Sequence, residues 1–146
     1  TIYLARRNIV FNKYKNVTLF KPNKKETMQG LGIQLNSYED IKYAGNKLLE
    51  KLKAEYILIT LGSAGMVLFE KNGDITKIPT VAKKIADVSG AGDTAIATFA
   101  TMLISGATCK EAAILANFAS GYVCEKPGIV AINQEQLLKA ASIMKI

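Results

Sequence analysis

The feature that most constrains the fold is the apolar run Tyr56–Thr60, in which apolar residues follow one another without alternation. Such a run is typical of a strand that is buried on both faces, as in sheets covered by helices. Before it, Ser37 and the apolar repeat up to Leu52 predict a capped amphipathic helix. After it, residues 66–69 and 75–78 flank Asn72-Gly73, a strong hairpin signal. The pattern predicts an α/β fold.

The rest of the chain predicts one further strand and three helices. Val17–Phe20 is short and β-branched and ends at a Pro, so we expect a strand there. Helices are expected at about residues 93–104, 109–123 and 134–144. A parallel sheet needs more than one βαβ unit, and the strands here are too few for it. We therefore expect residues 1–146 to form a single, partial domain.

The chain has 146 residues and contains no histidine. A Ser-His-Asp or Cys-His catalytic group and a His-ligated metal site are therefore excluded within it. Any general base has to be a carboxylate, a Lys, a Tyr or a Cys. The two cysteines, Cys109 and Cys124, lack metal-type spacing and are expected to be reduced, buried thiols. Reduced thiols favour a cytoplasmic location.

The net charge of +7 comes almost entirely from lysine, since Arg6 and Arg7 are the two arginines. Proteins that read base edges favour arginine, and no basic stripe is interleaved with aromatic residues, so we expect no nucleic-acid partner. An anionic small molecule such as a phosphate suits the charge better. No run approaches the length of a membrane span, and the first residues make a poor signal peptide.

The stretch Asp87–Thr94 carries the most chemical information. Two glycines and an alanine precede an acid at the start of a predicted helix. The free N–H groups of a helix start bind anions, and Asp93 could take a proton from an attacking hydroxyl. The alternative is structural: a glycine turn, with Asp93 as the N-cap acid. The spacing alone leaves both interpretations open.

Two other glycine-rich nucleotide motifs can be compared with this stretch. Gly90, Gly92 and Ala95 fit the G-x-G-x-x-A form of the dinucleotide fingerprint. That fingerprint belongs between two strands, whereas the sequence of residues 83–87 predicts a weak strand and the following predicted helix leads to another helix. A nicotinamide oxidoreductase is thus a minor alternative. A P-loop is excluded because no glycine is followed by Lys and then Ser or Thr.

Two more stretches follow predicted strands. Thr60–Gly65 is glycine-rich and well placed for a nucleotide, although a simple turn explains it equally well. Asn23 and Glu26 could reach a magnesium ion or its waters, although a surface turn explains them better on their own.

Taken in this order, the three stretches resemble motifs of the ribokinase-like, or phosphofructokinase-B, family of sugar kinases. The family signature Asp-Thr-x-Gly-Ala-Gly-Asp is matched by Asp87–Asp93, with Val88 in place of the Thr. The resemblance covers nearly the whole chain. It implies a ribokinase-like three-layer α/β/α sandwich, of which this chain is the carboxyl-terminal half, without the amino-terminal half and its lid.

The resemblance also implies roles for single residues. Asp93 would be the catalytic base, and the amides of Gly90, Ala91, Gly92 and Asp93 would form an anion hole. The other implied roles are magnesium for Asn23 and Glu26, nucleotide contact for Thr60, Gly62, Ser63, Gly65 and Asn117, and a monovalent cation such as K⁺ for Asp87 and Ser89. Asn117 on its own is also explained as an exposed polar residue of a helix.

Within the family, the chain is most similar to the kinases of bacterial heptose synthesis, at residues 17–23, 87–94 and 117–123. The similarity implies transfer of phosphate from MgATP to the anomeric hydroxyl of heptose 7-phosphate, a lipopolysaccharide precursor. The expected Lys-x-Gly-Thr is present as Lys126–Ile129, without the Thr. The implied partners are the sugar phosphate, ATP, the amino-terminal half and, in the full-length protein, a second copy. The alternatives are another carbohydrate kinase and a non-catalytic nucleotide-binding fragment.

Overall fold

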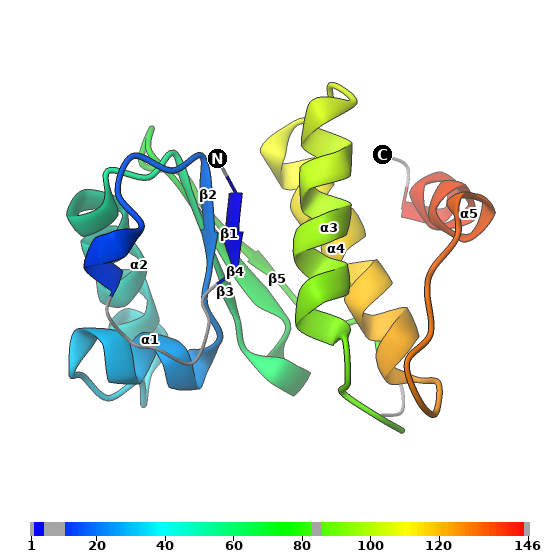
Figure 1. Cartoon of the computed structure of the whole chain (residues 1–146), viewed down its shortest axis with the longest axis horizontal. Coiled ribbons are helices and arrows are strands. Elements are labelled where there is room, and N and C mark those ends of the chain that lie inside the picture. Colours follow the sequence, from blue (N-terminus) through cyan, green and yellow to red (C-terminus); the bar gives the residue numbers. More distant parts are fainter. Residues whose placement is uncertain (1, 5–10, 83–85, 145–146) are drawn as a thin grey trace. The chain divides into compact units, whose positions relative to one another are not determined.

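The computed structural model of the chain describes residues 2–4, 11–82 and 86–144 (Figure 1). The chain divides into two compact units, an amino-terminal unit of residues 1–77 and a carboxyl-terminal unit of residues 78–146. Each unit has its own packing. The candidate site residues are divided between the two.

The amino-terminal unit is built on a sheet whose strands follow the order of the sequence, β1-β2-β3-β4-β5. β1, β2 and β3 are parallel to one another, and β4 runs antiparallel to β3. The register places Leu19 and Glu70 on either side of Tyr56. The strands are β1 (Ile2–Leu4), β2 (Leu19–Lys21), β3 (Tyr56–Thr60), β4 (Met66–Glu70) and β5 (Ile75–Ile78).

The predicted strands are confirmed, with one shift. β3 and the hairpin of β4 and β5 around Asn72-Gly73 match the prediction. β2 begins two residues later than expected. The carbonyls of Val17 and Thr18 already accept hydrogen bonds from the N–H groups of Glu55 and Tyr56, at 3.1 and 2.9 Å. Hydrogen bonding to the segment at the start of β3 therefore begins two residues before β2 itself.

Helices α1 (Lys24–Leu31) and α2 (Tyr38–Leu52) connect β2 to β3. Short 3-10 turns occur at Phe11–Lys13 and Gly62–Ala64. Ser37 caps α2 as predicted, because its hydroxyl accepts from the N–H of Asp40 while the Asp40 carboxylate accepts from the N–H of Ser37. No surface turn occupies Lys24–Glu26, which instead form the first turn of α1.

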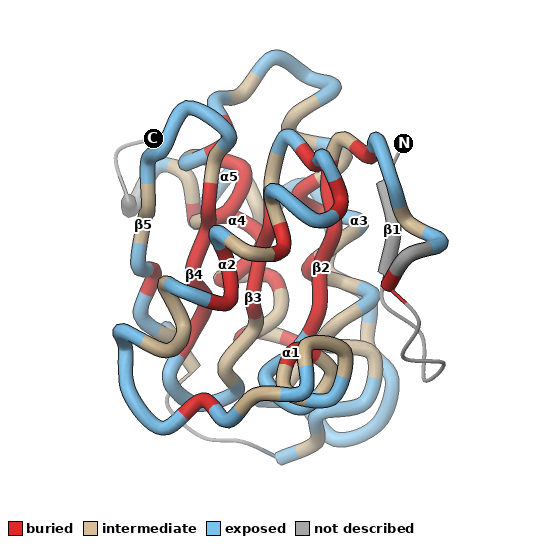
Figure 2. The backbone as a smooth tube through the Cα atoms, turned by 90° about the vertical axis from the view of Figure 1, so that its left-hand side faces the viewer, coloured by how far each residue is buried: buried red, intermediate tan, exposed pale blue. Residues whose placement is uncertain are grey.

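The core of the amino-terminal unit lies on one face of the sheet. Ile57, Ile59 and Phe69 pack there with residues of α2 such as Leu48. Ile57, Leu58 and Ile59 are all 0% exposed, which confirms that β3 is buried on both faces. Figure 2 shows the buried residues as continuous red segments along β2, β3 and β4.

The carboxyl-terminal unit contains the helices α3 (Ala91–Ile104), α4 (Cys109–Cys124) and α5 (Gln134–Met144). α3 and α4 pack along each other, and the residues that α4 buries are mostly small. The predicted caps are confirmed at Thr108 with Glu111 and at Asn133 with Gln136. α3 begins two residues earlier than predicted. α5 is tied to α4 by a hydrogen bond of 2.6 Å from Gln136 Nε2 to the hydroxyl of Tyr122.

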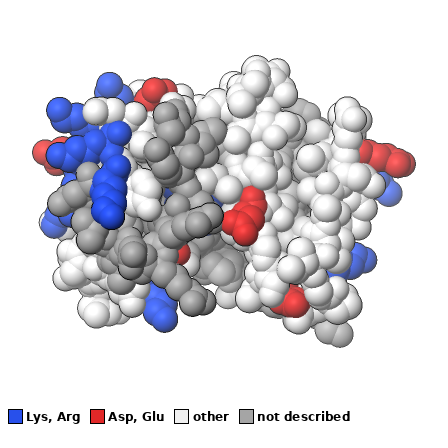
Figure 3. All heavy atoms as spheres, in the orientation of Figure 1, with Lys and Arg blue, Asp and Glu red and all other residues white. Residues whose placement is uncertain are grey.

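The described residues show the state of the cysteines, the character of the helices and the distribution of lysine. Cys109 and Cys124 are both free, the first buried and the second half-buried. No helix in the described ranges has the length and apolar character needed to cross a bilayer. Lysine side chains gather over the amino-terminal unit (Figure 3).

Candidate active site

The Asn23–Glu26 motif lies directly after the end of β2 and forms the start of α1. Asn23 Oδ1 accepts from the N–H of Glu26 at 2.8 Å, and Glu26 Oε2 accepts from the N–H of Asn23 at 2.7 Å. This reciprocal pair is a capping box, so the surface-turn interpretation is wrong. Among the described residues, the second carboxylate oxygen of Glu26 accepts no hydrogen bond. It is therefore open to a ligand.

The Thr60–Gly65 loop lies beside that motif at the carboxyl edge of the sheet. Asn23 and Thr60 form a parallel bridge, in which the N–H of Thr60 donates to the carbonyl of Pro22 at 3.0 Å. Gly62 and Gly65 both have positive φ angles, of 62° and 87°. A bond of 2.8 Å from the N–H of Leu61 to the carbonyl of Gly65 closes the loop. The loop serves as the turn into β4 and also occupies the edge where α/β proteins bind ligands.

The Asp87–Asp93 stretch forms the entry to α3. Gly90 is the N-cap in the left-handed conformation, with φ 78° and ψ −7°, and no side chain caps the helix. The interpretation of Asp93 as an N-cap acid is therefore wrong, since Asp93 lies in the first turn and is exposed. In the described part of the chain, the N–H groups of Gly92 and Asp93 have no acceptor. A helix start with free N–H groups is an anion site.

The residues suggested for a monovalent cation, Asp87 and Ser89, bind each other. The N–H of Ser89 donates to Asp87 Oδ1 at 2.8 Å. Hydrogen bonds from the backbone and the hydroxyl of Ser89 lower the pKa of the Asp87 carboxyl from its ordinary value. Burial of the Cys124 thiol, and to a smaller extent the charge of Asp87, raise the pKa of Cys124. The negative charge of Asp87 therefore lies close to the end of α4.

Asn117 is buried, at 4% exposed, which rules out the exposed helical position considered for it. Its side-chain Nδ2 donates to the carbonyl of Pro79 at 2.7 Å. This bond ties α4 to the segment that follows β5. Sequence reasoning gave no sign of the contact, because its two residues lie far apart in the chain.

These residues fit a magnesium ion that is held mainly by waters and substrate phosphates and only to a small extent by the protein. In the part of the chain that the structure describes, no cluster of three or more His, Cys, Asp or Glu side chains could hold a metal. Mg²⁺ typically keeps several waters and binds through one or two carboxylates together with substrate phosphates. The free carboxylate oxygen of Glu26 meets that requirement, whereas a dedicated metal cage is not present among these residues.

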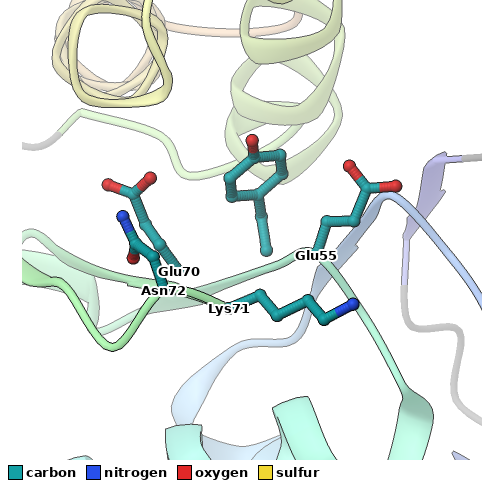
Figure 4. Close-up of a pocket in the computed structure, with 5 residues that line it drawn as sticks. Glu55, Glu70, Lys71 and Asn72 are labelled. Carbon is teal, nitrogen blue, oxygen red and sulfur yellow. The ribbon is translucent and has the colours of Figure 1, made fainter.

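A separate hollow of about 500 Å³ lies at the other end of β3 (Figure 4). It is lined by Glu55, Tyr56, Glu70, Lys71 and Asn72. Burial, and then the nearby charge of Asp74, raise the pKa of the Glu70 carboxyl. The hollow adjoins the start of β3, whereas Thr60 and Asn23 adjoin its end, so it is distinct from the candidate site.

Comparison with known proteins identifies the family. The family described as pfkB family carbohydrate kinase matches residues 10–136. The chain belongs to the pfkB family of carbohydrate kinases. The predicted family is thereby confirmed, and the dinucleotide-fingerprint interpretation is wrong. In the structure, α3 leads into α4 and not into a second strand.

The similar proteins include several with the name Bifunctional protein HldE. That of a Nitratiruptor species is 42% identical over 127 residues, which cover 87% of this chain and 27% of the relative. That of Campylobacter curvus is 40% identical over 133 residues, or 89% of this chain and 28% of the relative. The chain therefore spans about a quarter of the length of these relatives.

Solved structures of a ribokinase and a phosphofructokinase confirm the predicted ribokinase-like α/β fold. Ribokinase of Arabidopsis thaliana, complexed with ribose and ATP, matches with a TM-score of 0.85 at 24% identity, covering 94% of this chain and 46% of that one. Phosphofructokinase-2 of Escherichia coli, in complex with substrates and products, matches with a TM-score of 0.86 at 18% identity, covering 99% and 47%. At these identities the likeness concerns the fold alone.

Proposed function

We propose that this chain carries the catalytic base and the nucleotide site of an ATP-dependent carbohydrate kinase. The observation that carries the proposal is the entry to α3. There the exposed Asp93 carboxylate lies in the same turn as the N–H groups of Gly92 and Asp93, which lack acceptors within the described residues. A base beside an anion site is the combination that phosphoryl transfer to a hydroxyl requires. Membership of the pfkB family supports the same chemistry.

In the proposed reaction the oxygen of a sugar hydroxyl attacks the γ-phosphorus of ATP. The hydroxyl proton passes to the carboxylate of Asp93, the new O–P bond forms, and the bond from the γ-phosphorus to the bridging oxygen breaks to release ADP. Negative charge spreads over the transferred phosphoryl group in the transition state. The N–H groups at the start of α3, together with the helix dipole, would stabilise that charge.

The remaining motif residues would hold the nucleotide and its metal. Asn23 and Glu26 would bind Mg²⁺ or its waters, and Mg²⁺ neutralises phosphate charge when it is bound. The loop with Thr60, Gly62, Ser63 and Gly65 would contact the phosphates, since its glycines allow close approach of the backbone. Asn117 would act near the base of the nucleotide. It would do so through the helix that it anchors, because its Nδ2 already donates a hydrogen bond to the carbonyl of Pro79.

For the acceptor we propose the anomeric hydroxyl of heptose 7-phosphate. The support is the motif similarity to heptose kinases at residues 17–23, 87–94 and 117–123. A phosphorylated sugar also suits a chain with a net charge of +7. Ile129, in place of the usual Thr, favours a second candidate, a kinase for another carbohydrate. A third candidate is a nucleotide-binding module without transfer.

The test is an Asp93→Asn variant, made in the protein expressed from its complete reading frame. With MgATP and heptose 7-phosphate, we expect kcat to fall at least about a hundredfold, the typical scale for loss of a general base, with ATP affinity nearly unchanged. The matched control is Asp74→Asn, which removes a carboxylate from the hairpin turn and should leave kcat unaltered.

Each outcome separates the candidates. Unchanged turnover in Asp93→Asn removes Asp93 from the mechanism. Turnover of ribose or fructose 6-phosphate in preference to heptose 7-phosphate favours the second candidate. ATP binding without transfer to any of these sugars by the wild-type protein favours the third.

A further inference from the structure

The turn that opens α3 is held by the segment that follows α4, and this arrangement gives Asp87 a role beyond those proposed above. The inference rests on the proposed function, because it concerns the same anion site. The N–H groups of Ala86 and Asp87 both donate to the carbonyl of Cys124, at 2.8 and 3.1 Å. The last carbonyls of a helix have no partners within it, so these bonds dock the turn onto the end of α4.

The carboxylate of Asp87 makes a second set of bonds in the same place. It accepts from the N–H of Ser89 at 2.8 Å. Hydrogen bonding to the backbone of Gly128, in the loop after α4, and of Val88 also lowers the pKa of this carboxyl. A carboxylate offers about four lone-pair positions, and here Ser89 and the backbone of Gly128 and Val88 compete with a cation for them. This competition disfavours a cation, although Asp87 matches a cation-binding position of the family.

These bonds determine the direction of the anion-site amides. Ser89 immediately precedes Gly90, whose left-handed conformation turns the chain into α3. The N–H of Ala91 is drawn back to the carbonyl of Val88 at 3.3 Å, and the N–H of Thr94 closes the first helical turn on Gly90 at 2.8 Å. The N–H groups of Gly92, between them, and of Asp93 have no acceptor among the described residues, and their position follows from the shape of the turn at residues 87–91.

We propose that Asp87 is a positioning residue, which fixes the entry to α3 against the loop after α4 and so shapes the anion site without a monovalent cation. Asp87 acts through the amides of the turn and needs no contact with substrate.

The kinetic test compares Asp87→Ala and Asp87→Asn with the wild type in the protein from the complete reading frame, assayed with MgATP and heptose 7-phosphate. Asp87→Ala is expected to lower kcat at least about tenfold with little change in the KM for ATP, since small misplacements of a site cost rate. Asp87→Asn keeps an acceptor oxygen for Ser89 and should recover most of that loss. Wild-type rates should be equal in K⁺ and Na⁺ buffers.

Two kinetic results overturn the proposal. One is full kcat in Asp87→Ala. The other is a wild-type requirement for K⁺ that Asp87→Ala merely shifts to higher concentration, because Asp87 is then a cation ligand. Thermal melting of both variants distinguishes a lost site from an unfolded protein, and Asp87→Asn tests the proposal if Asp87→Ala fails to fold.

A second measurement tests the positioning role of Asp87 without an activity assay. If the wild type phosphorylates no sugar, the proposed function is refuted, but this test of Asp87 still applies. Amide hydrogen exchange over residues 86–94 should quicken in Asp87→Ala and stay slow in the wild type and in Asp87→Asn, because the N–H of Ser89 loses its acceptor. The control Asp74→Ala should change exchange only in its own hairpin. Unaltered exchange in Asp87→Ala overturns the proposal whatever the activity.

Discussion

Replacement of Gly90 by Ala should affect thermal stability and kcat to very different extents. Gly90 has φ 78°, in the left-handed region where an L-residue with a Cβ is strained by about 1–2 kcal/mol. Space is not limiting, because the added Cβ would meet only the Ile129 side chain at an ordinary 3.9 Å. The lower entropy of the unfolded Ala chain offsets about 0.4–1 kcal/mol of the strain. We therefore expect a net loss of about 1 kcal/mol and a fall in Tm of about 2–5 °C.

The effect on catalysis should be much larger than the effect on stability. The strained Ala relaxes by rotating away from the left-handed region, and that rotation redirects the amides of the turn. Loss of one preorganised donor to a developing anion typically lowers kcat about 10²- to 10³-fold. The matched control is Gly106→Ala at the opposite end of α3, with φ 92° and nothing within 4 Å of the added Cβ. It carries a similar strain but lies at the wrong end of the helix to bind an anion.

The assay is a pair of thermal melts and a pair of kcat measurements on the protein from the complete reading frame. Similar losses of stability with a large loss of kcat in Gly90→Ala alone confirm the reasoning. Equal losses of kcat in both variants would mean that strain in α3, and not the direction of its first amides, sets the rate. Full activity in Gly90→Ala refutes the anion site at this turn.

Two further predictions concern the amino-terminal unit. Gly45→Ala on α2 should destabilise the protein by about 1–3 kcal/mol, the typical cost of overpacking, because the new Cβ would lie 2.4 Å from ring atoms of the fully buried Phe69. A melting temperature at or above that of the wild type contradicts this prediction. The control is Asn46→Ala, at an exposed position of the same helix. Hydrogen bonds from the backbone and side chain of Ser37 lower the pKa of Asp40 below its ordinary 3.8. This carboxylate therefore stabilises the fold above that pH, and the contribution is lost as the pH falls through the lowered pKa. Urea titrations should show that Asp40→Asn destabilises the protein at pH 7 and that the difference from wild type shrinks as the pH is lowered below 3.8.

Much of the fold can be predicted where one local signal dominates. The continuous apolar run predicts β3, Asn72-Gly73 predicts the hairpin, and the cap and periodicity predict α2. α1 was missed because its sequence has little apolar periodicity and buries only Thr27. The sequence does contain a signal for α1, because the spacing of Asn23 and Glu26 is that of a capping box, and this spacing is sufficient to predict the start of the helix.

The site was predictable as a set of motifs but not as a set of contacts. The amide of Asn117 binds the carbonyl of Pro79 across a large separation in sequence, which no local pattern encodes. The start of α3 was misplaced because Gly90, and not an acid, caps it. Glycine caps a helix through its backbone conformation, so the sequence offered no side chain to mark the position. The roles of Asp93, Asn23 and the Thr60–Gly65 loop stay predictions.

The bridge between Asn23 and Thr60 also has a consequence for how the proposed nucleotide site forms during folding. β2 and β3 are parallel and α1 and α2 lie between them in the chain, so a long segment has to close before Thr60 can bond to Pro22. Closing a long loop costs entropy before its contacts form, which makes such pairings slow. A chain in which β2 and β3 are not yet paired therefore lacks the arrangement of the two motifs that the proposed site requires. Nucleotide binding should stabilise the whole amino-terminal unit, and slowed hydrogen exchange in β2 and β3, and not in the loops alone, would show it.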